Sequence, residues 1–418
     1  MIFSRKNYLD QLTGKPKGSM IKIITGLRRS GKSFFLFRLF KQYLLQNGVD
    51  EEHIIEIILD DRLYLEMRDP DKCLSYIRSR IQDKEWYYLL IDEVQLMSDF
   101  VDVLNSCLHI SNLDVYVTGS NSRFLVSDVA TEFRGRGNEI RLYPLSFSEY
   151  AEVFPDKSWD ELWEEYALYG GLPLVASEPS VKAKRSYLKQ LFATTYLKDV
   201  VDRYGIKNTE AMNTIVDIIS SSIGSLTNPN KLQDTFKTVS KESLSAVTIS
   251  QYIDYLEDAF LISKARRYDV KGRKYIGSPF KYYFTDMGLR NARLNFRQIE
   301  DTHIMENVIY NELLKRGCEV DVGVIEVVEK DDQGKPVHKR IEIDFVVNQG
   351  YERYYIQSAL TLPTTEKRRA EERPLLRVGD GFKKIIITKD QTPLRQTENG
   401  ITIMGLRQFL TDENSLKL

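Results

Sequence analysis

Gly26-Leu27-Arg28-Arg29-Ser30-Gly31-Lys32-Ser33 is the stretch that decides the fold of this chain. It matches the pattern G-x-x-x-x-G-K-[ST], in which the glycines let backbone N–H groups curl around phosphate oxygens. An apolar run over 21–25 precedes the stretch, and residues 33–45 follow it with the apolar pattern of a helix packed beside a sheet. The sequence therefore predicts a strand, a phosphate-binding loop and a helix, which together begin the parallel sheet of a P-loop NTPase.

The chemistry of this loop assigns roles to its residues. Lys32 is expected to reach the β- and γ-phosphates of a nucleoside triphosphate, and the Ser33 hydroxyl is expected to ligate Mg²⁺. The amino end of the following helix adds partial positive charge. The residues that we expect to contact the nucleotide here are Gly26, Leu27, Arg28, Arg29, Ser30, Gly31, Lys32, Ser33 and Phe34.

Two acids follow a second apolar strand. Residues 86–91 predict a buried strand, and Asp92 and Glu93 come directly after it. Asp92 is expected in the Mg²⁺ shell, and Glu93 is placed to polarise the attacking water or accept its proton. A strand predicted at 53–59 lies between the loop and these acids, as in NTPases with a catalytic glutamate. The alternative is a strand that exits to solvent on acidic residues.

Polar residues also follow the strand predicted at 113–118. Ser120 and Asn121 are candidates for sensing the γ-phosphate or positioning water, because such strand ends point at the ligand in parallel sheets. An ordinary turn with capping residues is the alternative. Arg136 lies in a predicted loop, from which an arginine can reach the nucleotide of a neighbouring subunit as a finger. A solvated basic turn is the alternative for Arg136.

Composition excludes several classes of protein. The 418 residues carry 59 Lys and Arg against 60 Asp and Glu, which rules out a basic coat for nucleic acid over the whole chain. No apolar run approaches the roughly 18 residues that cross a bilayer, and no signal peptide is visible. Cys73, Cys107 and Cys318 lie far apart, which disfavours a disulfide framework or a cysteine zinc site. We therefore expect a cytoplasmic protein with no membrane partner.

Motifs along nearly the whole chain, from about residue 18 to about 410, resemble those of one known family. Beyond the loop and the acid strand they are Thr118–Ser122, Phe133–Arg136, Tyr143–Tyr150, Tyr169–Pro173, Tyr196–Val200, Lys281–Leu289, Glu306-Asn307, Glu342–Phe345 and Tyr355–Gln357. They resemble the archaeal-type AAA ATPases that carry an uncharacterised, DUF4143-like C-terminal domain. The resemblance implies an ATPase core, a helical and winged-helix middle, and a C-terminal domain similar to restriction-endonuclease-like folds. Many relatives have Thr where this chain has Ser33, and the hydroxyl chemistry is kept.

The predicted fold class is α/β, with four segments. Residues 1–145 are predicted to form the P-loop AAA ATPase domain, with strands and helices alternating along a parallel sheet. Residues 146–205 are predicted as a helical, lid-like segment and residues 206–295 as a winged-helix-like domain. Residues 296–418 are predicted as an α/β nuclease-like domain.

A basic segment at 264–281 is the candidate contact for DNA. The segment contains seven basic residues and one acidic residue, Asp269. Tyrosines are interleaved with the basic residues, which suits phosphate contacts and stacking. The preceding helix carries Asp254, Glu257 and Asp258, which would repel a DNA backbone. A surface that faces solvent, a protein partner or a second copy of the chain is therefore the alternative.

The C-terminal segment lacks part of a nuclease site. Nucleases of the fold that it resembles need a carboxylate on a helix, an acid on a strand, and then a second acid and a lysine on the next strand. Glu306 and Asp344 match the first two positions, but Gln357 and Ala359 occupy the others. Alanine can neither stabilise charge nor activate water, so we expect a nuclease-like shell that serves binding or packing.

These patterns lead to one main hypothesis and two alternatives. The main one is an AAA-type ATPase that binds and hydrolyses MgATP, and in which hydrolysis switches the arrangement of the later domains. A nucleotide-gated module that binds DNA or protein with little turnover is the first alternative, and an ATP-dependent nuclease is the weaker one. The predicted catalytic residues are Lys32, Glu93, Asn121 and Arg136. The predicted ligands of Mg²⁺ are Ser33 and Asp92, with Ser120 as a further nucleotide contact.

Overall fold

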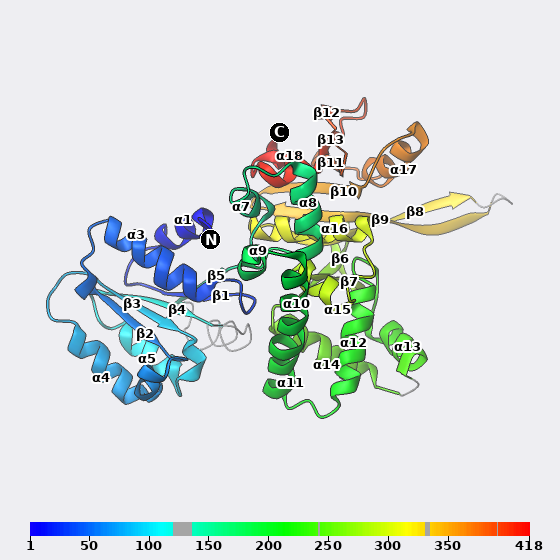
Figure 1. Ribbon diagram of the computed structural model, residues 1–418. Coiled ribbons are helices and arrows are strands. Elements are labelled where there is room, and N and C mark those ends of the chain that lie inside the picture. Colours follow the sequence, from blue (N-terminus) through cyan, green and yellow to red (C-terminus); the bar gives the residue numbers. More distant parts are fainter. Residues whose placement is uncertain (120–135, 241–242, 331–334, 391) are drawn as a thin grey trace. The chain divides into compact units, whose positions relative to one another are not determined.

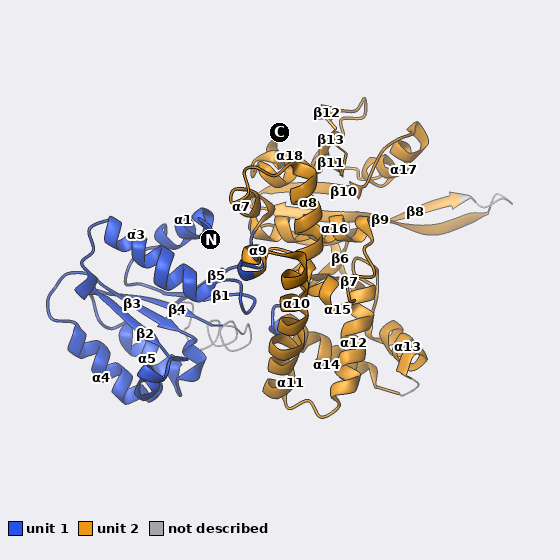
Figure 2. Cartoon of the chain, viewed as in Figure 1, with its two compact units in different colours: residues 1–145, 172–174, 258–260 blue, residues 146–171, 175–257, 261–418 orange. Residues whose placement is uncertain are grey.

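The structure is a computed structural model that describes residues 1–119, 136–240, 243–330, 335–390 and 392–418 (Figure 1). It divides into two compact units (Figure 2). Unit 1 comprises Met1–Leu145, Leu172–Leu174 and Asp258–Phe260, and unit 2 comprises the remaining residues. The segments predicted at 146–205, 206–295 and 296–418 thus fall almost wholly within unit 2. As separate domains they stay predictions.

Unit 1 is built on a parallel sheet of five strands in the order β2-β3-β4-β1-β5. Strand β4 lies between the strand that leads into the loop and the strand that ends in the two acids. The predicted parallel P-loop sheet is therefore confirmed. Its strands are β1 (Ile21–Thr25), β2 (Ile54–Ile58), β3 (Tyr87–Asp92), β4 (Leu113–Thr118) and β5 (Gly137–Arg141).

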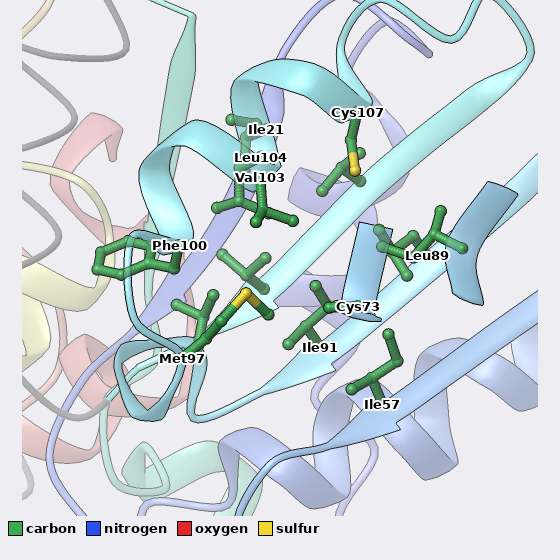
Figure 3. Close-up of a cluster of buried hydrophobic side chains, with 14 of the residues drawn as sticks. Ile21, Ile57, Cys73, Leu89, Ile91, Met97, Phe100, Val103, Leu104 and Cys107 are labelled. Atoms are coloured by element: carbon green, nitrogen blue, oxygen red, sulfur yellow. The ribbon is translucent and has the colours of Figure 1, made fainter. Parts of the chain in front are cut away.

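Helices cover both faces of this sheet, because its strands are apolar on both sides (Figure 1). On one face, α5 (Phe100–Cys107) and α4 (Pro70–Arg80) pack against alternate strand residues such as Ile57 and Leu89, as Figure 3 shows. On the other face pack α1 (Lys6–Thr13) and the helical run after the loop. That run comprises α2 (Lys32–Phe34), a π-helical segment (Phe35–Phe40) and α3 (Lys41–Gln46).

Short 3₁₀ turns complete unit 1. They lie at Glu51–His53, Arg62–Arg68 and Val94–Leu96. The last of them follows the two acids directly, so the chain bends sharply as soon as β3 has placed them. This bend keeps both acids at the carboxyl edge of the sheet.

Unit 2 begins with helices and then adds a sheet. Serine residues begin several of its helices, and Ser146 and Ser158 each form a capping box with the glutamate three residues later. The helices are α7 (Phe147–Ala151), α8 (Trp159–Tyr169), α9 (Pro173–Ser177), α10 (Val181–Leu191) with a π-helical continuation (Phe192–Leu197), α11 (Lys198–Tyr204), α12 (Thr209–Ser221), α13 (Pro229–Ser240), α14 (Ala246–Asp258), α15 (Met287–Arg293), α16 (Asp301–Lys315), α17 (Thr365–Leu376), α18 (Leu406–Thr411) and a 3₁₀ turn (Ser415–Lys417).

The sheet of unit 2 has eight strands in the order β12-β13-β11-β10-β9-β8-β6-β7. The hairpin formed by β6 and β7, which carries the basic segment, joins it through parallel pairing of β6 with β8. The boundary predicted at residue 295 therefore runs through one continuous sheet. The strands are β6 (Ile262–Asp269), β7 (Lys274–Phe284), β8 (Glu319–Lys330), β9 (Pro336–Gln349), β10 (Glu352–Ala359), β11 (Lys383–Thr388), β12 (Arg395–Gln396) and β13 (Thr402–Gly405).

Two glycine motifs of unit 2 are explained by close packing. The carboxylate of Asp286 accepts the N–H of Gly171 at 2.7 Å and the N–H of Leu289 at 3.1 Å. A Cβ on Gly170 would lie 2.2 Å from that carboxylate, and a Cβ on Gly288 would lie 2.0 Å from the carbonyl oxygen of Tyr169. Only glycine fits at either position, so these motifs serve packing.

Among the described residues, no helix has the length and apolar character needed to span a membrane. The cysteines Cys73, Cys107 and Cys318 are free and buried. Burial raises the pKa of the Cys73 and Cys107 thiols to about 12, and of the Cys318 thiol to about 11. Thiols with such pKa values are poor nucleophiles, so we assign them to packing.

Candidate functional site

The phosphate loop leaves the carboxyl end of β1 through a glycine that no other residue can replace. Gly26 has a φ of 135°, and a Cβ there would lie 2.2 Å from the carbonyl oxygen of Leu142. Leu142 also donates its N–H to the carbonyl of Thr25 at 2.8 Å. Gly31 has a φ of 100°. Gly26 thus lets the loop turn tightly against Leu142, just after β5, and Gly31 supplies a second positive φ.

Lys32 points back into this loop. Its side chain is nearly fully buried, and its ammonium group donates to the carbonyls of Gly26 at 3.0 Å and Leu27 at 3.2 Å. Burial lowers the pKa of Lys32 to about 8, although nearby Glu93 and Asp92 oppose that shift. A cation held against neutral carbonyls creates a field that favours an incoming anion.

The predicted ligands of Mg²⁺ lie together. Asp92 is 3% exposed at the end of β3, and its carboxylate accepts a hydrogen bond from the hydroxyl of Thr118. Burial raises the pKa of Asp92, and the hydroxyls of Thr118 and nearby Ser33 oppose that shift. The loop and two neighbouring strands therefore place one carboxylate and two hydroxyls at one point.

Glu93 lies beside this point in an unusual backbone conformation. Its φ is 49°, in the left-handed region, and its N–H donates to the Thr118 hydroxyl at 3.0 Å. The Gln95 amide donates to the Glu93 carboxylate. Non-glycine residues seldom adopt this conformation unless the surroundings hold them there, and such strain is common at functional sites. Thr118 touches both acids, since its hydroxyl donates to Asp92 and accepts from Glu93.

Sequence reasoning missed Thr118 and Gln95. Thr118 carried a usable signal: it is the polar residue that ends an apolar strand, as Asp92 is. Gln95 carried none, because its role depends on the turn after β3. Ser120 and Asn121, the predicted sensors, lie outside the described residues.

The remaining predicted contacts differ in exposure. Arg28, Arg29, Ser33 and Phe34 are exposed, and Phe34 is 44% exposed despite its aromatic ring. The others turn inward: the Leu27 side chain and Ser30 are buried. The exposed residues are therefore the ones whose side chains a ligand can reach.

Arg136 lies far from the loop of its own chain. Its carbonyl accepts the N–H of Ile21 at 2.9 Å, at the amino end of β1. The loop leaves the other end of that five-residue strand, at a distance of about 16 Å. The structure therefore does not bring Arg136 into the site of its own chain, and its action in a neighbouring subunit stays a prediction. Arg141, which pairs with Thr25, is the arginine of β5 at the loop edge.

A second polar cluster lies in unit 2. Lys281 of β7 is 3% exposed, and its ammonium lies 2.8 Å from Glu306 Oε1 and 2.7 Å from Glu342 Oε1. The Tyr283 hydroxyl donates to Glu306 Oε1 at 2.6 Å. Burial disfavours charge on Lys281, but the surrounding Glu306, Asp344 and Glu342 carboxylates outweigh burial and hold its pKa above the usual value.

Asp344 completes this cluster. Its Oδ2 accepts the N–H of Ser358 at 2.8 Å, and burial, together with the nearby Glu306, raises its pKa to about 8. Gln357 Oε1 lies 3.4 Å from the Asp344 N–H, and Ala359 is buried. In the part of the chain that the structure describes, no group of three or more His, Cys, Asp or Glu is placed to hold a metal ion. Lys281, Glu306 and Glu342 thus form a largely buried ion-pair network beside Asp344.

The basic segment at 264–281 is only partly a surface. Arg267 and Lys281 are buried, which removes them from any contact with DNA. The exposed cations gather at the turn between β6 and β7 and on the adjoining strand. They are Arg266, Lys271, Arg273 and Lys274.

Comparisons with known proteins agree with the architecture of unit 1. A family model described as "AAA domain" matches residues 18–151. A second one, "Domain of unknown function (DUF8612)", matches residues 160–300, so the expected DUF4143-like domain is not confirmed. Among solved structures, the Aeropyrum pernix ORC1 protein in complex with DNA aligns with 71% of this chain and 93% of its own, at 13% identity and a TM-score of 0.28. A score that low supports no further argument.

Two curated proteins resemble the chain over most of its length. An uncharacterised protein of Methanocaldococcus jannaschii is 26% identical over 364 residues, which cover 84% of this chain and 76% of that one. An uncharacterised protein of Haemophilus influenzae is 34% identical over 417 residues, which cover 98% of each chain. The chain therefore belongs to one family with the Haemophilus influenzae protein, and its residues 18–151 form an AAA domain.

Proposed function

We propose that the chain binds MgATP at the loop Gly26–Ser33 and hydrolyses it. The observation that carries this proposal is the meeting of Lys32, Ser33 and Asp92 at the carboxyl edge of one parallel sheet. The match of residues 18–151 to the AAA domain supports ATP as the nucleotide. Ligands of open parallel sheets bind at this edge, where the helix after the loop adds partial positive charge.

The residues present fit a magnesium ion. Ser33 and Asp92 offer a hydroxyl and a carboxylate, which are oxygen ligands of the kind that Mg²⁺ accepts together with waters and phosphate oxygens. The bound ion would supply positive charge against the phosphate oxygens. Lys32 adds a second positive charge from inside the loop. This charge would stabilise the negative charge that develops during phosphoryl transfer.

Glu93 is the residue that we assign to the attacking water. Its carboxylate is oriented by Gln95, and its backbone is tied to Thr118. A carboxylate held in this way can orient water or accept its proton without reorganising during the reaction.

Two substitutions separate binding from hydrolysis. Lys32→Met should weaken ATP binding, measured by calorimetry, by at least about 100-fold, because it removes the cation of the loop. Glu93→Gln should retain ATP binding but lose about 100-fold or more in turnover. Exposed Lys6→Met and Glu52→Gln are the matched controls. Wild-type turnover in Glu93→Gln, or wild-type affinity in Lys32→Met, would refute these assignments.

Arg136 remains our candidate for a finger acting in trans. Arg136→Ala should then lose turnover, and so should Lys32→Met. Mixing the two inactive proteins should restore turnover, because mixed assemblies contain one intact loop facing one intact Arg136. Full activity of Arg136→Ala alone would remove Arg136 from the reaction.

A second candidate function is binding of nucleic acid with little turnover of ATP. The observation that favours it is the exposed basic turn between β6 and β7, where Tyr275 is 56% exposed among the cations. The double variant Lys271→Glu/Arg273→Glu should weaken binding of a DNA duplex and flatten its salt dependence. Lys207→Glu/Lys237→Glu, which makes the same change of charge elsewhere on unit 2, is the control. Equal weakening in both variants would mean that the turn has no special role.

The proposal includes a switch that links nucleotide to unit 2. Amide hydrogen exchange of unit 2 should differ between protein saturated with ATP in the Glu93→Gln background and protein with ADP. Identical exchange patterns would confine the effect of the nucleotide to unit 1.

A further inference from the structure

We propose that Arg5, which lies outside every motif of the chain, is a positioning residue for the phosphate loop. The inference rests on the proposed function, since it concerns the same nucleotide site. Arg5 would fix the orientation of the peptide unit between Ser30 and Gly31. It would thereby direct the Gly31 N–H towards the side of the loop that receives phosphate.

The contacts of Arg5 are buried and specific. Arg5 is 4% exposed, and its Nη2 donates to the carbonyl of Ser30 at 2.9 Å and to the carbonyl of Tyr143 at 3.0 Å. The guanidinium carbon lies 5.5 Å from the centre of the Tyr8 ring. The Tyr8 hydroxyl accepts the N–H of Tyr143 at 3.3 Å. One guanidinium nitrogen thus joins the loop to the chain just after β5.

The backbone of Arg5 also indicates that its position is specified. Arg5 precedes α1 with φ 49° and ψ 30°, in the left-handed region that costs a non-glycine residue free energy. The Arg5 carbonyl accepts the N–H groups of Tyr8 and Leu9, each at 3.1 Å, so the first turn of α1 holds this conformation. The turn therefore aims the Arg5 side chain at the loop.

Peptide geometry connects these contacts to phosphate binding. In a trans peptide the carbonyl of one residue and the N–H of the next point in opposite directions. Because Arg5 holds the Ser30 carbonyl, the Gly31 N–H of the same peptide unit must point away from Arg5. Backbone N–H groups of this loop are the donors that surround phosphate in the motif.

Gly31 is the position where such a constraint matters most. Glycine populates conformations of positive φ as readily as the usual ones, so the peptide unit before it can flip at low cost. A flip would turn a carbonyl towards the phosphate and repel it. A buried guanidinium bonded to the Ser30 carbonyl opposes that flip, and it contributes a positive charge behind the loop.

Calorimetry with MgATP tests this proposal. Arg5→Met should weaken ATP binding by about 10- to 100-fold, as expected for loss of a charge-assisted hydrogen bond that orients a donor. Arg5→Lys, which keeps the charge and can make one of the bonds, should recover part of the affinity. In turnover assays KM should rise while kcat at saturation changes little, since bound ATP itself restores the peptide orientation. Exposed Lys6→Met, on the same turn, is the control.

Hydrogen exchange of the Ser30 amide, which donates to the Leu27 carbonyl at 3.1 Å, supplies an independent readout in nucleotide-free protein. The exchange should be faster in Arg5→Met than in wild type, while the exchange of the β3 and β4 amides stays unchanged. A folded Arg5→Met protein with wild-type ATP affinity and wild-type Ser30 exchange would overturn the proposal, as would equal losses in Arg5→Met and Arg5→Lys. If wild type itself fails to bind ATP, the proposed function falls. The Ser30 exchange then still decides whether Arg5 orders the loop.

Discussion

Lys32 in unit 1 and Lys281 in unit 2 are both almost completely buried, yet their surroundings treat the charge in opposite ways. Lys32 is 5% exposed and donates to two neutral carbonyls, and burial lowers its pKa to about 8. Lys281 is 3% exposed and lies within hydrogen-bonding distance of two carboxylates, which hold its pKa above the usual value.

This difference distinguishes a lysine that can bind a ligand from a lysine that stabilises the fold. A buried cation that its own chain leaves poorly compensated is unfavourable in the free protein, and an anionic ligand relieves that cost. A buried cation that carboxylates already neutralise gains little from a ligand, but removing it strands the partner charges. The same substitution at the two lysines should therefore have opposite effects on stability.

Lys281→Met should give the largest loss of stability. Removing the cation leaves the buried Glu306 carboxylate without its ion-pair partner, and breaking a buried pair costs about 3–5 kcal/mol. Urea unfolding followed by circular dichroism measures this loss, with exposed Lys271→Met as the control. The double variant Lys281→Met/Glu306→Gln should recover part of it. A loss of less than about 1 kcal/mol for Lys281→Met would remove the contrast between the two lysines.

Lys32→Met should instead stabilise the nucleotide-free protein at pH 7. The pKa of Lys32 in the folded chain, about 8, lies below the ordinary 10.5, so its charged form is disfavoured by folding. This penalty is at most about 3 kcal/mol. It is fully present below pH 8 and disappears as the pH rises to 10.5. The melting temperature of Lys32→Met should therefore exceed that of wild type at pH 7, and the gap should close at about pH 10. A destabilised Lys32→Met at pH 7 would contradict this description of the loop.

Asp344→Asn sharpens the account of the unit 2 cluster. The pKa of Asp344 in the folded chain, about 8, lies above the ordinary 3.8, so wild type loses stability as the pH rises between these values. The stability of Asp344→Asn relative to wild type should increase between about pH 5 and pH 9 by more than about 1 kcal/mol. Exposed Asp234→Asn should show no such trend. A flat difference would mean that Asp344 is ionised throughout.

Thr118→Val should have the smallest effect on stability, about 1 kcal/mol. Valine has nearly the shape of threonine, so the change removes a hydroxyl and leaves no cavity. The same change should lower ATP turnover by roughly tenfold, since the hydroxyl bonds both Asp92 and the Glu93 backbone. Thr118→Ser keeps the hydroxyl and should restore most of the turnover. Equal turnover in Thr118→Val and wild type would show that the acids need no such support.

The sequence predicted the parts of the site that local patterns encode. The loop pattern and the apolar strands located Lys32, Ser33 and Asp92, because each lies at a strand end or helix start that hydrophobic periodicity marks. Thr118 and Arg5 were missed because their roles depend on contacts between distant segments. Arg5 and Ser30, for example, lie 25 residues apart.

Unit 2 was harder to predict for the same reason. The charge pattern placed Lys281 among the exposed cations of the basic segment. In the structure its side chain is buried and pairs with Glu306 on α16. The parallel pairing of β6 with β8 joins segments about 50 residues apart, and no local pattern specifies such a partner. Charge counts along the chain therefore overestimated the basic surface.

Calorimetric titration of the folded wild-type chain and of Lys32→Met with MgATP tests the central claim most directly. The claim predicts that wild type binds about one ATP per chain and that Lys32→Met, although at least as stable at pH 7, binds at least about 100-fold more weakly. No binding by folded wild type, or equal binding by both proteins, would contradict it.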